Sequence, residues 1–576
     1  MNNNIVRDAI NEGGFYKNVQ RFCIKTILAK RTDIILFCFL IMASMKFVSS
    51  IETSMDIGLA DESYFLHNGV KLIENGLPSA QWAPLYAIWY YLLSSLEKDT
   101  INLFYLNYKI LIFLTTLALY ICLRRIKVNP YVSIISSFFY LISVIPQLFV
   151  HCLLFALLIL LLFLIFTTFA RSEEEHHFLL GIGILLLSLV RPEYFISFLL
   201  FCLVFLYFIL QKIKAGLIKY NSGLLIMFSF SAIVFLQLYF FGNPLHGDRS
   251  WLAFGMNFSR NFVRWHNLSI NPWSNWEQIT KSVFGDANSI ISAATSNSKE
   301  FFRHILYNAV GYIKNLIDMP LSALQNLIPV ILNKLIRRTE LLFIIIIIIH
   351  LLRKRHDIKK ISDNKVIRHF LLIFVVISIP VMLTALIMTP NYHYLTIQAV
   401  IFIIFFSYLI SKSITSYTEK KQTRLLTSFL LGVLIFLLTP NRFNGWDIMP
   451  MPKMEGKIGL QMKQQDLKTI KFIRALNITE KVNMLEAARG YFVYLGDNYK
   501  MITESEKKEK FDNFILNNKV NMIVSDKTLE QDTRFIDDSE FKSFLEKPDR
   551  LGFTKIKIPN TEKYLFVKNI LLKNNF

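Results

Sequence analysis

The sequence predicts a polytopic α-helical membrane protein with about eleven transmembrane helices and a small extracytoplasmic α/β domain at the C-terminal end. Of the 576 residues, 53% are hydrophobic and 18% are charged, whereas about a quarter is charged in a typical soluble protein. The mean hydropathy is +0.41. The apolar residues are clustered, and runs such as Leu153–Phe169 and Ile344–Ile349 contain no charged side chain.

Each predicted span is an apolar run bounded by polar segments, since a helix needs about 20 mainly apolar residues to cross a bilayer. Residues 1–32 precede the first apolar run, and no small-residue cleavage site follows that run. We therefore expect residues 1–32 to form a cytoplasmic N-terminus. We expect the spans at 33–50, 101–123, 131–149, 151–169, 177–190, 193–211, 222–241, 339–352, 367–388, 394–411 and 425–439.

The charges between the spans predict the orientation of the chain. Turns predicted to face the cytoplasm are basic, as at Arg124-Arg125, Arg353-Lys354-Arg355 and Lys420-Lys421, in agreement with the positive-inside rule. A transmembrane domain over 33–440 then has two large extracytoplasmic loops, 51–100 and 242–338. The tail 446–576 lies on the same side of the membrane as these loops.

The tail 446–576 has the mixed pattern of a small α/β domain. An amphipathic helix is expected at Lys457–Leu476, and further helices at Glu504–Asn517 and Ser539–Glu546. Short apolar runs at Val482–Glu486 and Val520–Val524 predict buried strands, and Thr554–Ile558 with Tyr564–Val567 predicts a hairpin.

Charge and cysteine content exclude two classes of protein. The net charge is +21, but the basic residues lie in short inter-span segments and form no basic-aromatic stripe, so we expect no nucleic acid as a partner. None of the five cysteines falls in the long polar regions, which argues against a disulfide framework. No paired Cys/His spacing for zinc occurs.

The first extracytoplasmic loop contains an adjacent pair of carboxylates, Asp61 and Glu62, about ten residues beyond a span end. Such a pair at the membrane surface is a candidate for acid-base chemistry. The alternative is structural: Asp61 caps a helix running from Glu62 to Asn75, which Gly76 and Pro78 would end. The two interpretations are compatible, because a capping carboxylate can keep one oxygen free.

Two short extracytoplasmic turns also carry polar groups at membrane depth, where charge is costly and often marks a site. The first is Arg191-Pro192-Glu193, for which the alternative is an arginine that reaches to the interface beside a neighbouring carboxylate. The second is Asn391-Tyr392-His393-Tyr394, for which the alternative is an interfacial aromatic belt.

The loop 242–338 combines Trp, Arg and carboxylate residues, among them Arg249, Arg260 and Arg264. Arginine suits the binding of phosphate groups. The same composition suits a helix lying in the membrane interface. Spacing singles out none of these residues.

The order of these features resembles the membrane glycosyltransferases of the GT-C fold. The chain resembles especially the bacterial group similar to protein O-mannosyltransferases and the lipid A aminoarabinose transferases, over most of residues 33–440. The shared features are one span, the Asp61-Glu62 pair, a Trp82 to Pro84-Leu85-Tyr86 turn, the Arg191-Pro192 turn, the Tyr392-His393-Tyr394 turn and an external C-terminal domain.

The resemblance implies transfer of a sugar from a polyprenyl-phosphate carrier to an extracytoplasmic lipid, glycan or protein acceptor, in a bacterial plasma (inner) membrane. It implies Asp61 as the base, Glu62 as its support, and inversion at the anomeric carbon. A divalent metal serves some relatives, so no cofactor is assigned. The donor phosphate would be bound by Arg191, His393, Arg249, Arg260 and Arg264. Substrate contacts would come from Tyr64, Trp82, Tyr86, Glu193 and Tyr392.

Two other classes of protein fit a polytopic chain with intramembrane charges. A transporter or flippase of lipid-linked saccharides would show pseudo-repeated halves and broken helices, which the sequence lacks. A non-catalytic envelope assembly protein would be built around the C-terminal domain.

Overall fold

The computed structural model describes residues 31–147, 151–217, 220–244, 249–273, 275–327, 365–413, 421–440, 464–487, 489–502, 509–530 and 535–572. The chain is mostly helical, with a small sheet near its C-terminal end. Six helices in the described part are long and apolar enough to cross a membrane. Three shorter apolar helices accompany them, at Cys152–Thr167, Leu372–Ile387 and Gln422–Leu438. These features agree with a membrane-embedded protein.

Ten long helices form the bundle that the apolar runs predict. They are α2 (Arg31–Val48), α7 (Thr100–Arg125), α8 (Pro130–Ile142), α9 (His151–Thr167), α10 (Glu173–Ser188), α11 (Tyr194–Lys214), α12 (Tyr220–Phe241), α19 (Lys365–Ile387), α20 (Tyr392–Ser413) and α21 (Lys421–Leu438). The predicted span 339–352 lies outside the described residues, and the count of about eleven stays a prediction. Helix α8 ends earlier than predicted, because the 3-10 turn η3 (Ile145–Gln147), which contains Pro146, follows it.

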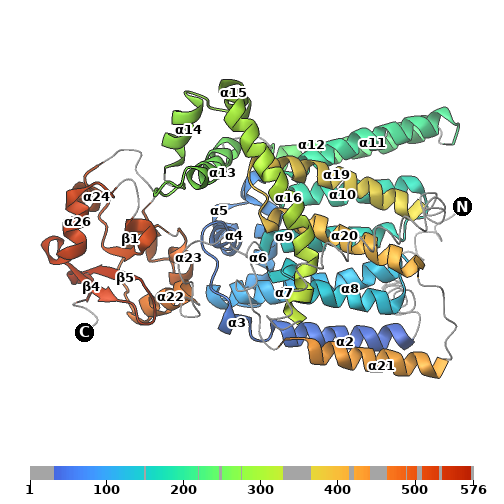
Figure 1. Cartoon of the computed structure of the whole chain (residues 1–576), viewed down its shortest axis with the longest axis horizontal. Helices are drawn as coiled ribbons and strands as arrows, with labels where there is room; N and C mark the ends of the chain where they lie inside the picture. Colours follow the sequence, from blue (N-terminus) through green and yellow to red (C-terminus); the bar gives the residue numbers. More distant parts are fainter. Residues whose placement is uncertain are drawn as a thin grey trace, which may run out of the picture.

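The bundle carries its polar turns at two opposite ends. Figure 1 shows the helices running side by side, with the C-terminal domain at one end, here called the domain end. At the opposite end, Arg124 pairs with Asp33 at 2.7 Å and Lys212 pairs with Glu173 at 2.9 Å. The two segments 51–99 and 249–297, which we predicted on one side, both lie at the domain end.

The segment predicted as the first loop, 51–100, is folded into short helices at the domain end. The prediction of a single helix from Glu62 to Asn75 is wrong, because one helix ends at its C-cap, Lys71, and a second, short helix follows it. Gly76 ends the second with φ +74°, as predicted. The elements are α3 (Ile51–Ser54), α4 (Asp61–Val70), α5 (Leu72–Asn75), η2 (Ala80–Trp82) and α6 (Pro84–Ser94).

The described part of the segment predicted as the second loop contains four helices. They are α13 (Arg249–Trp265), α14 (Trp276–Phe284), α15 (Ile290–Ser296) and α16 (Ser298–Leu327). The first three pack around Phe254 and Phe258, while α16 crosses the ends of α19, α20 and α8 (Figure 1). Asn308 donates to the Leu386 and Met388 carbonyls at the end of α19, and Ser322 binds the Val144 amide beyond α8.

Helix α16 buries polar side chains and exposes apolar ones, as a helix at the membrane interface does. His304 and Asn308 are fully buried against the bundle, whereas Phe302, Leu306 and Val310 are 59%, 67% and 71% exposed. Ile313 and Ile317 continue the exposed stripe along the helix. This arrangement agrees with the alternative of an interfacial helix, because such a helix turns its apolar face to lipid.

The C-terminal domain is a five-stranded mixed sheet with helices on its faces. The strand order is β2-β1-β3-β5-β4, in which β2, β1 and β3 are parallel and β5 is antiparallel to β3 and β4. The elements are α22 (Gln465–Ala475), β1 (Val482–Glu486), α23 (Tyr491–Leu495), β2 (Tyr499–Met501), α24 (Phe511–Asn517), β3 (Met522–Ser525), α25 (Lys527–Glu530), α26 (Ser539–Glu546), η6 (Pro548–Leu551), β4 (Phe553–Lys557), β5 (Tyr564–Lys568) and α27 (Asn569–Leu572).

The sequence predicts most of this domain correctly. Strand β1 and helix α26 have the predicted bounds, and β4 with β5 is the predicted hairpin. Helices α22 and α24 begin at Gln465 and Phe511, and the predicted helical residues 457–463 and 504–508 lie outside the described part. The short strand β2 and the helix α23 were not predicted.

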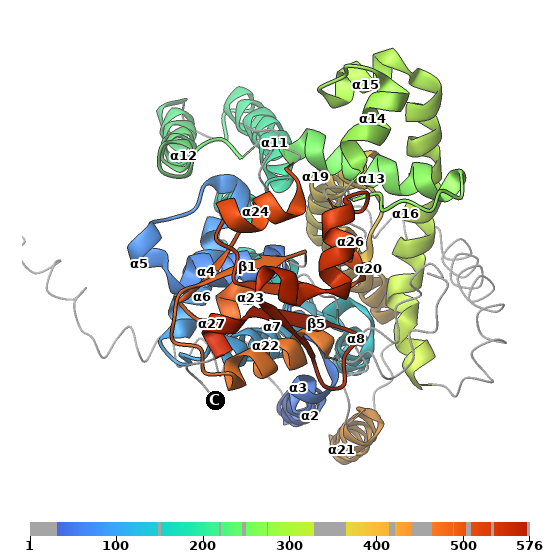
Figure 2. The same cartoon turned by 90° about the vertical axis from the view of Figure 1, so that its left-hand side faces the viewer.

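The C-terminal domain is packed onto the bundle rather than tethered to it. Figure 2 shows the sheet in front of α4, α6 and α7, and one continuous hydrophobic core joins the two parts. The Tyr494 hydroxyl donates to the Gly58 carbonyl, and Asp56 accepts from the amides of Asp466 and Leu467 at the start of α22. Arg474 pairs with Asp99 across the same interface.

Candidate functional site

Four segments that are distant in the sequence meet at the domain end of the bundle. They are the start of α4, the turn between α10 and α11, helix α13 and the start of α20. Asp61, Arg191 and Glu193 all interact electrostatically with the Tyr394 hydroxyl. Arg191 and Arg260 both act on the His393 ring. The predicted base and three of the predicted phosphate ligands therefore belong to one cluster, here called the Asp61 cluster.

Asp61 is exposed at the first position of α4. The prediction that it caps this helix is wrong: the capping position is Ala60, at φ 54°, and no side chain caps the helix. The reason is a backbone contact, because the Ala60 amide donates to the Arg489 carbonyl of the C-terminal domain at 2.6 Å. Asp61 still lies in the first turn, where the helix dipole favours a carboxylate.

Glu62 points away from solvent into the bundle. It is 3% exposed, and its Oε1 accepts from the hydroxyls of Tyr86 at 2.8 Å and Tyr90 at 2.5 Å. Asn107 on α7 donates to both hydroxyls, at 2.7 and 2.9 Å, and accepts from the Trp89 indole at 2.8 Å. Tyr86, predicted as a substrate contact, is fully buried and instead holds Glu62.

Arg191 and Glu193 form a nearly buried ion pair at the turn between α10 and α11. The Arg191 Nη2 lies 2.8 Å from the Glu193 Oε1, and the two side chains are 13% and 12% exposed. The guanidinium also lies over the Tyr394 ring, 5.5 Å from its centre. The turn therefore presents a fixed, oriented positive group beside the start of α20.

Arg260 on α13 is a second positive group at the start of α20. Its two terminal nitrogens lie 3.4 and 3.5 Å from the Asn391 Oδ1, and it makes no ion pair with any described carboxylate. Burial, followed by the charge of Arg264, lowers the pKa of Arg260. A half-buried guanidinium without a counter-ion favours the binding of an anion.

The other predicted residues lie around this cluster. Arg264 is exposed and donates to the Tyr307 hydroxyl at 2.9 Å, and the side chain of Arg249 lies outside the described residues. The Tyr64 ring packs against Trp82, with 6.3 Å between ring centres. Tyr392 is half-buried against the bundle core.

Two residues of the C-terminal domain reach the site and were not predicted. Glu486, at the end of β1, and Arg489, in the loop after it, both act electrostatically on Tyr64. Gly490, at φ +138°, brings this loop against α4, because a Cβ there would lie 2.2 Å from the Ser63 Oγ. Sites in α/β domains often form at the carboxyl ends of parallel strands, and this rule would have selected Glu486.

Burial perturbs the carboxyl of Glu486. The residue is 4% exposed, and its Oε2 accepts from the amides of Gly490 and Tyr491, at 3.2 and 3.1 Å. Its Oε1 is buried without a hydrogen-bond donor. Burial, reinforced by Asp466, raises the pKa of Glu486 to about 7 despite the amide contacts.

Within the described residues, no group of three or more His, Cys, Asp and Glu side chains is placed to hold a metal ion. The Asp61 cluster brings together a carboxylate, Asp61, the guanidinium groups of Arg191 and Arg260, and the imidazole of His393, linked through Tyr394 and His393. No protein-family model and no curated protein matches the chain.

Proposed function

We propose that the protein is an inverting glycosyltransferase that moves a sugar from a polyprenyl-phosphate donor to an acceptor at the outer face of the bacterial plasma membrane. The observation that carries the proposal is the Asp61 cluster, in which exposed Asp61 and Arg191 both act electrostatically on Tyr394, while Arg191 and Arg260 both act on His393. A lipid-phosphate donor needs such groups at the membrane surface, because its tail stays in the bilayer while its phosphate stays at the surface.

The donor phosphate binds between Arg191 and Arg260 in this proposal. Arg191 is held by Glu193, while Arg260 makes only long contacts to a neutral amide, so Arg260 is the group with charge to give to a ligand. The charges of both guanidinium groups act on His393, whose ring can donate or accept a hydrogen bond. Preorganised donors of this kind stabilise the charge that develops on a leaving phosphate.

Asp61 accepts the proton of the acceptor hydroxyl. The hydroxyl oxygen forms a bond to the anomeric carbon, and the bond from that carbon to the phosphate oxygen breaks with its electron pair. The released polyprenyl phosphate gains the negative charge that Arg260 and Arg191 neutralise. A single displacement inverts the anomeric configuration. Glu62 positions the start of α4 through Tyr86 and Tyr90.

The membrane topology is part of the same proposal. About eleven spans place the N-terminus in the cytoplasm and the domain end outside. The layout of the bundle supports this arrangement, because α4, α13 and the C-terminal domain share one end (Figure 1). An accessibility reagent directed at a cysteine introduced at position 286 would react from outside the cell.

Asp61→Asn in the full-length protein tests the function. The protein, reconstituted in nanodiscs, is given polyprenyl-phosphate hexoses and pentoses with an envelope extract as the source of acceptor, and released polyprenyl phosphate is measured. Loss of a positioned base lowers the rate by about 10²- to 10⁴-fold. Asp286→Asn, at a side chain that is 95% exposed, is the matched control and keeps the wild-type rate.

Two results would overturn the proposal. One is an unchanged rate of carrier release in a correctly folded Asp61→Asn protein. The other is movement of the intact lipid-linked sugar across the membrane without release of the carrier, which identifies a flippase.

A further inference from the structure

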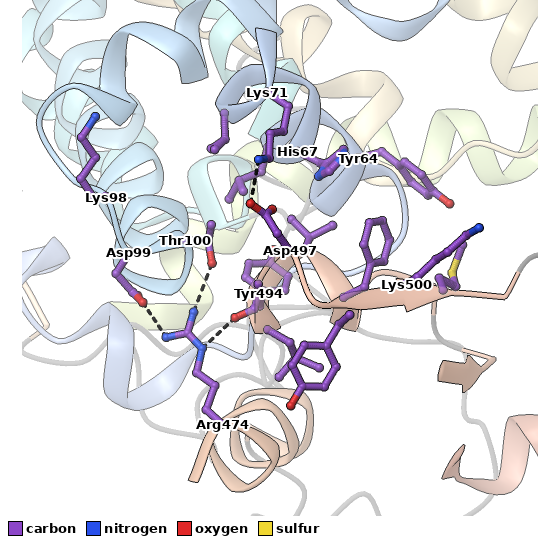
Figure 3. A pocket seen from close by; sticks show the side chains of 18 residues that line it. Tyr64, His67, Lys71, Lys98, Asp99, Thr100, Arg474, Tyr494, Asp497 and Lys500 are labelled. Carbon is purple, nitrogen blue, oxygen red and sulfur yellow. Dashed lines mark hydrogen bonds and ion pairs between the residues drawn. The ribbon is translucent and has the colours of Figure 1, made fainter. Parts of the chain in front are cut away.

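A pocket of about 640 Å³, a volume typical of small-molecule sites, lies between the bundle and the C-terminal domain. It lies between α4, the start of α7 and the elements α22, α23 and β2 (Figure 3). Tyr64 lines it, whereas Asp61 does not. No predicted residue other than Tyr64 belongs to it.

The charges of this interdomain pocket favour a dianion. Its lining has more positive than negative side chains: Lys71, Lys98, Arg474 and Lys500 against Asp99 and Asp497. Burial lowers the pKa of His67, so the ring is neutral near pH 7 and adds no charge. The excess of two positive charges matches a phosphate monoester, which carries about −1.5 to −2 at pH 7.

The positive groups differ in their availability. Lys71 is paired with Asp497 at 2.9 Å, and Arg474 is held by Asp99, Thr100 and the Tyr494 carbonyl. Lys98 and Lys500 have no hydrogen bond or ion pair from their ammonium groups within the described chain. Figure 3 shows these two lysines on opposite sides of the pocket, one from the bundle and one from β2.

The wall of the pocket beside α4 is aromatic. Phe492 on α23 packs edge-to-face against Tyr64, with 6.3 Å between ring centres, and against His67, with 5.4 Å. The face of an aromatic ring is the negative end of its quadrupole, so it attracts the C–H face of a sugar ring. Aromatic and cationic groups together indicate a phosphorylated sugar rather than a bare ion.

We infer that the interdomain pocket binds an anionic saccharide, of the phosphorylated class, through Lys98, Lys500 and the Phe492 face. Tyr64 and Asp61 are three residues apart on α4, about 5 Å along the helix axis. The bound saccharide is therefore the acceptor, one helical turn from the base. The identity as acceptor rests on the proposed function, whereas the binding does not.

The test is a ligand-observed NMR titration of the full-length protein in nanodiscs with glucose 6-phosphate, inorganic phosphate and glucose. Glucose 6-phosphate is expected to bind at least about tenfold more tightly than either fragment, and less tightly as the salt concentration rises. Lys98→Ala with Lys500→Ala weakens it about tenfold or more. Lys542→Ala with Lys547→Ala, which removes two exposed lysines from the C-terminal domain, leaves the affinity for glucose 6-phosphate unchanged.

Phe492→Leu tests the contact with the sugar ring separately from the contact with the phosphate charge. It weakens glucose 6-phosphate and leaves inorganic phosphate unchanged, in a protein whose melting temperature shows that it is folded. Equal affinity for inorganic phosphate and glucose 6-phosphate overturns the saccharide class, and full affinity in the double lysine variant overturns the pocket. Asp61→Asn is expected to keep the affinity for glucose 6-phosphate, because Asp61 does not line the pocket. Binding and sugar transfer are therefore tested separately, and either proposal can fail while the other holds.

Discussion

Glu486→Gln removes the most perturbed carboxyl of the C-terminal domain and changes how stability depends on pH. The pKa of Glu486 is raised from 4.5 to about 7, mainly by burial. Between these values the folded protein binds a proton that the unfolded chain has lost, so stability falls as pH rises from about 4.5 to 7. From about pH 5.5 to 7.5 this linkage lowers the opening free energy of the domain by about 2 kcal/mol.

Hydrogen exchange of the β1 amides in the full-length protein measures this opening free energy, after correction for the intrinsic exchange rate at each pH. Glutamine keeps an oxygen for the Gly490 and Tyr491 amides but cannot ionise. The fall in opening free energy between about pH 5.5 and 7.5 is therefore about 2 kcal/mol smaller in Glu486→Gln. Asp56, whose pKa burial and Asp466 raise to about 6, leaves a smaller slope of the same sign. Glu546→Gln, at an exposed position, is the control. An unchanged slope in Glu486→Gln would refute the reasoning.

Three further substitutions test the bundle. Arg260→Met should lower carrier release about 100-fold or more. Its melting temperature should stay equal or rise, because the substitution removes a half-buried charge that has no ion pair with any described carboxylate. A lower melting temperature would contradict this. Asn107→Leu should cost about 2–4 kcal/mol in chemical denaturation, since it leaves the Trp89 indole without an acceptor and removes two donors. Val310→Glu should cost about 1–3 kcal/mol in nanodiscs but little in mild detergent, and Lys299→Glu on the same helix should cost little in either.

The sequence was sufficient where a single local rule decides the structure. Val482–Glu486 is an apolar run of strand length, and it forms a strand with those bounds. The predicted apolar spans that lie in the described residues form helices, because a helix satisfies the backbone groups of an apolar run internally. Short elements outside such rules were missed, among them β2, which is three residues long, and α23, which is five.

Long-range contacts account for most of what the sequence did not predict. Asp61 is not a cap because the Arg489 carbonyl, more than 400 residues later, fixes the preceding residue. Tyr64 and Tyr86 looked equivalent as substrate contacts, yet one lines the pocket and the other is buried against Glu62. Helix α16 mixes polar and apolar residues, and only packing against α19 shows that its polar face is the inner one.

Half-buried Arg260 and buried Glu486 are ionisable groups of a kind more typical of a functional site than of a stabilising contact. Arg260 and Glu486 lie on different parts of the structure, and neither has an ion pair among the described residues. Burial shifts the pKa of each toward its neutral form. A protein gains no stability from such groups, whereas a site that binds a charged substrate or moves a proton needs them. Glu486 and Arg489 act electrostatically on Tyr64 of α4 from the C-terminal domain, so separating this domain from the bundle would remove both charges from the surroundings of α4.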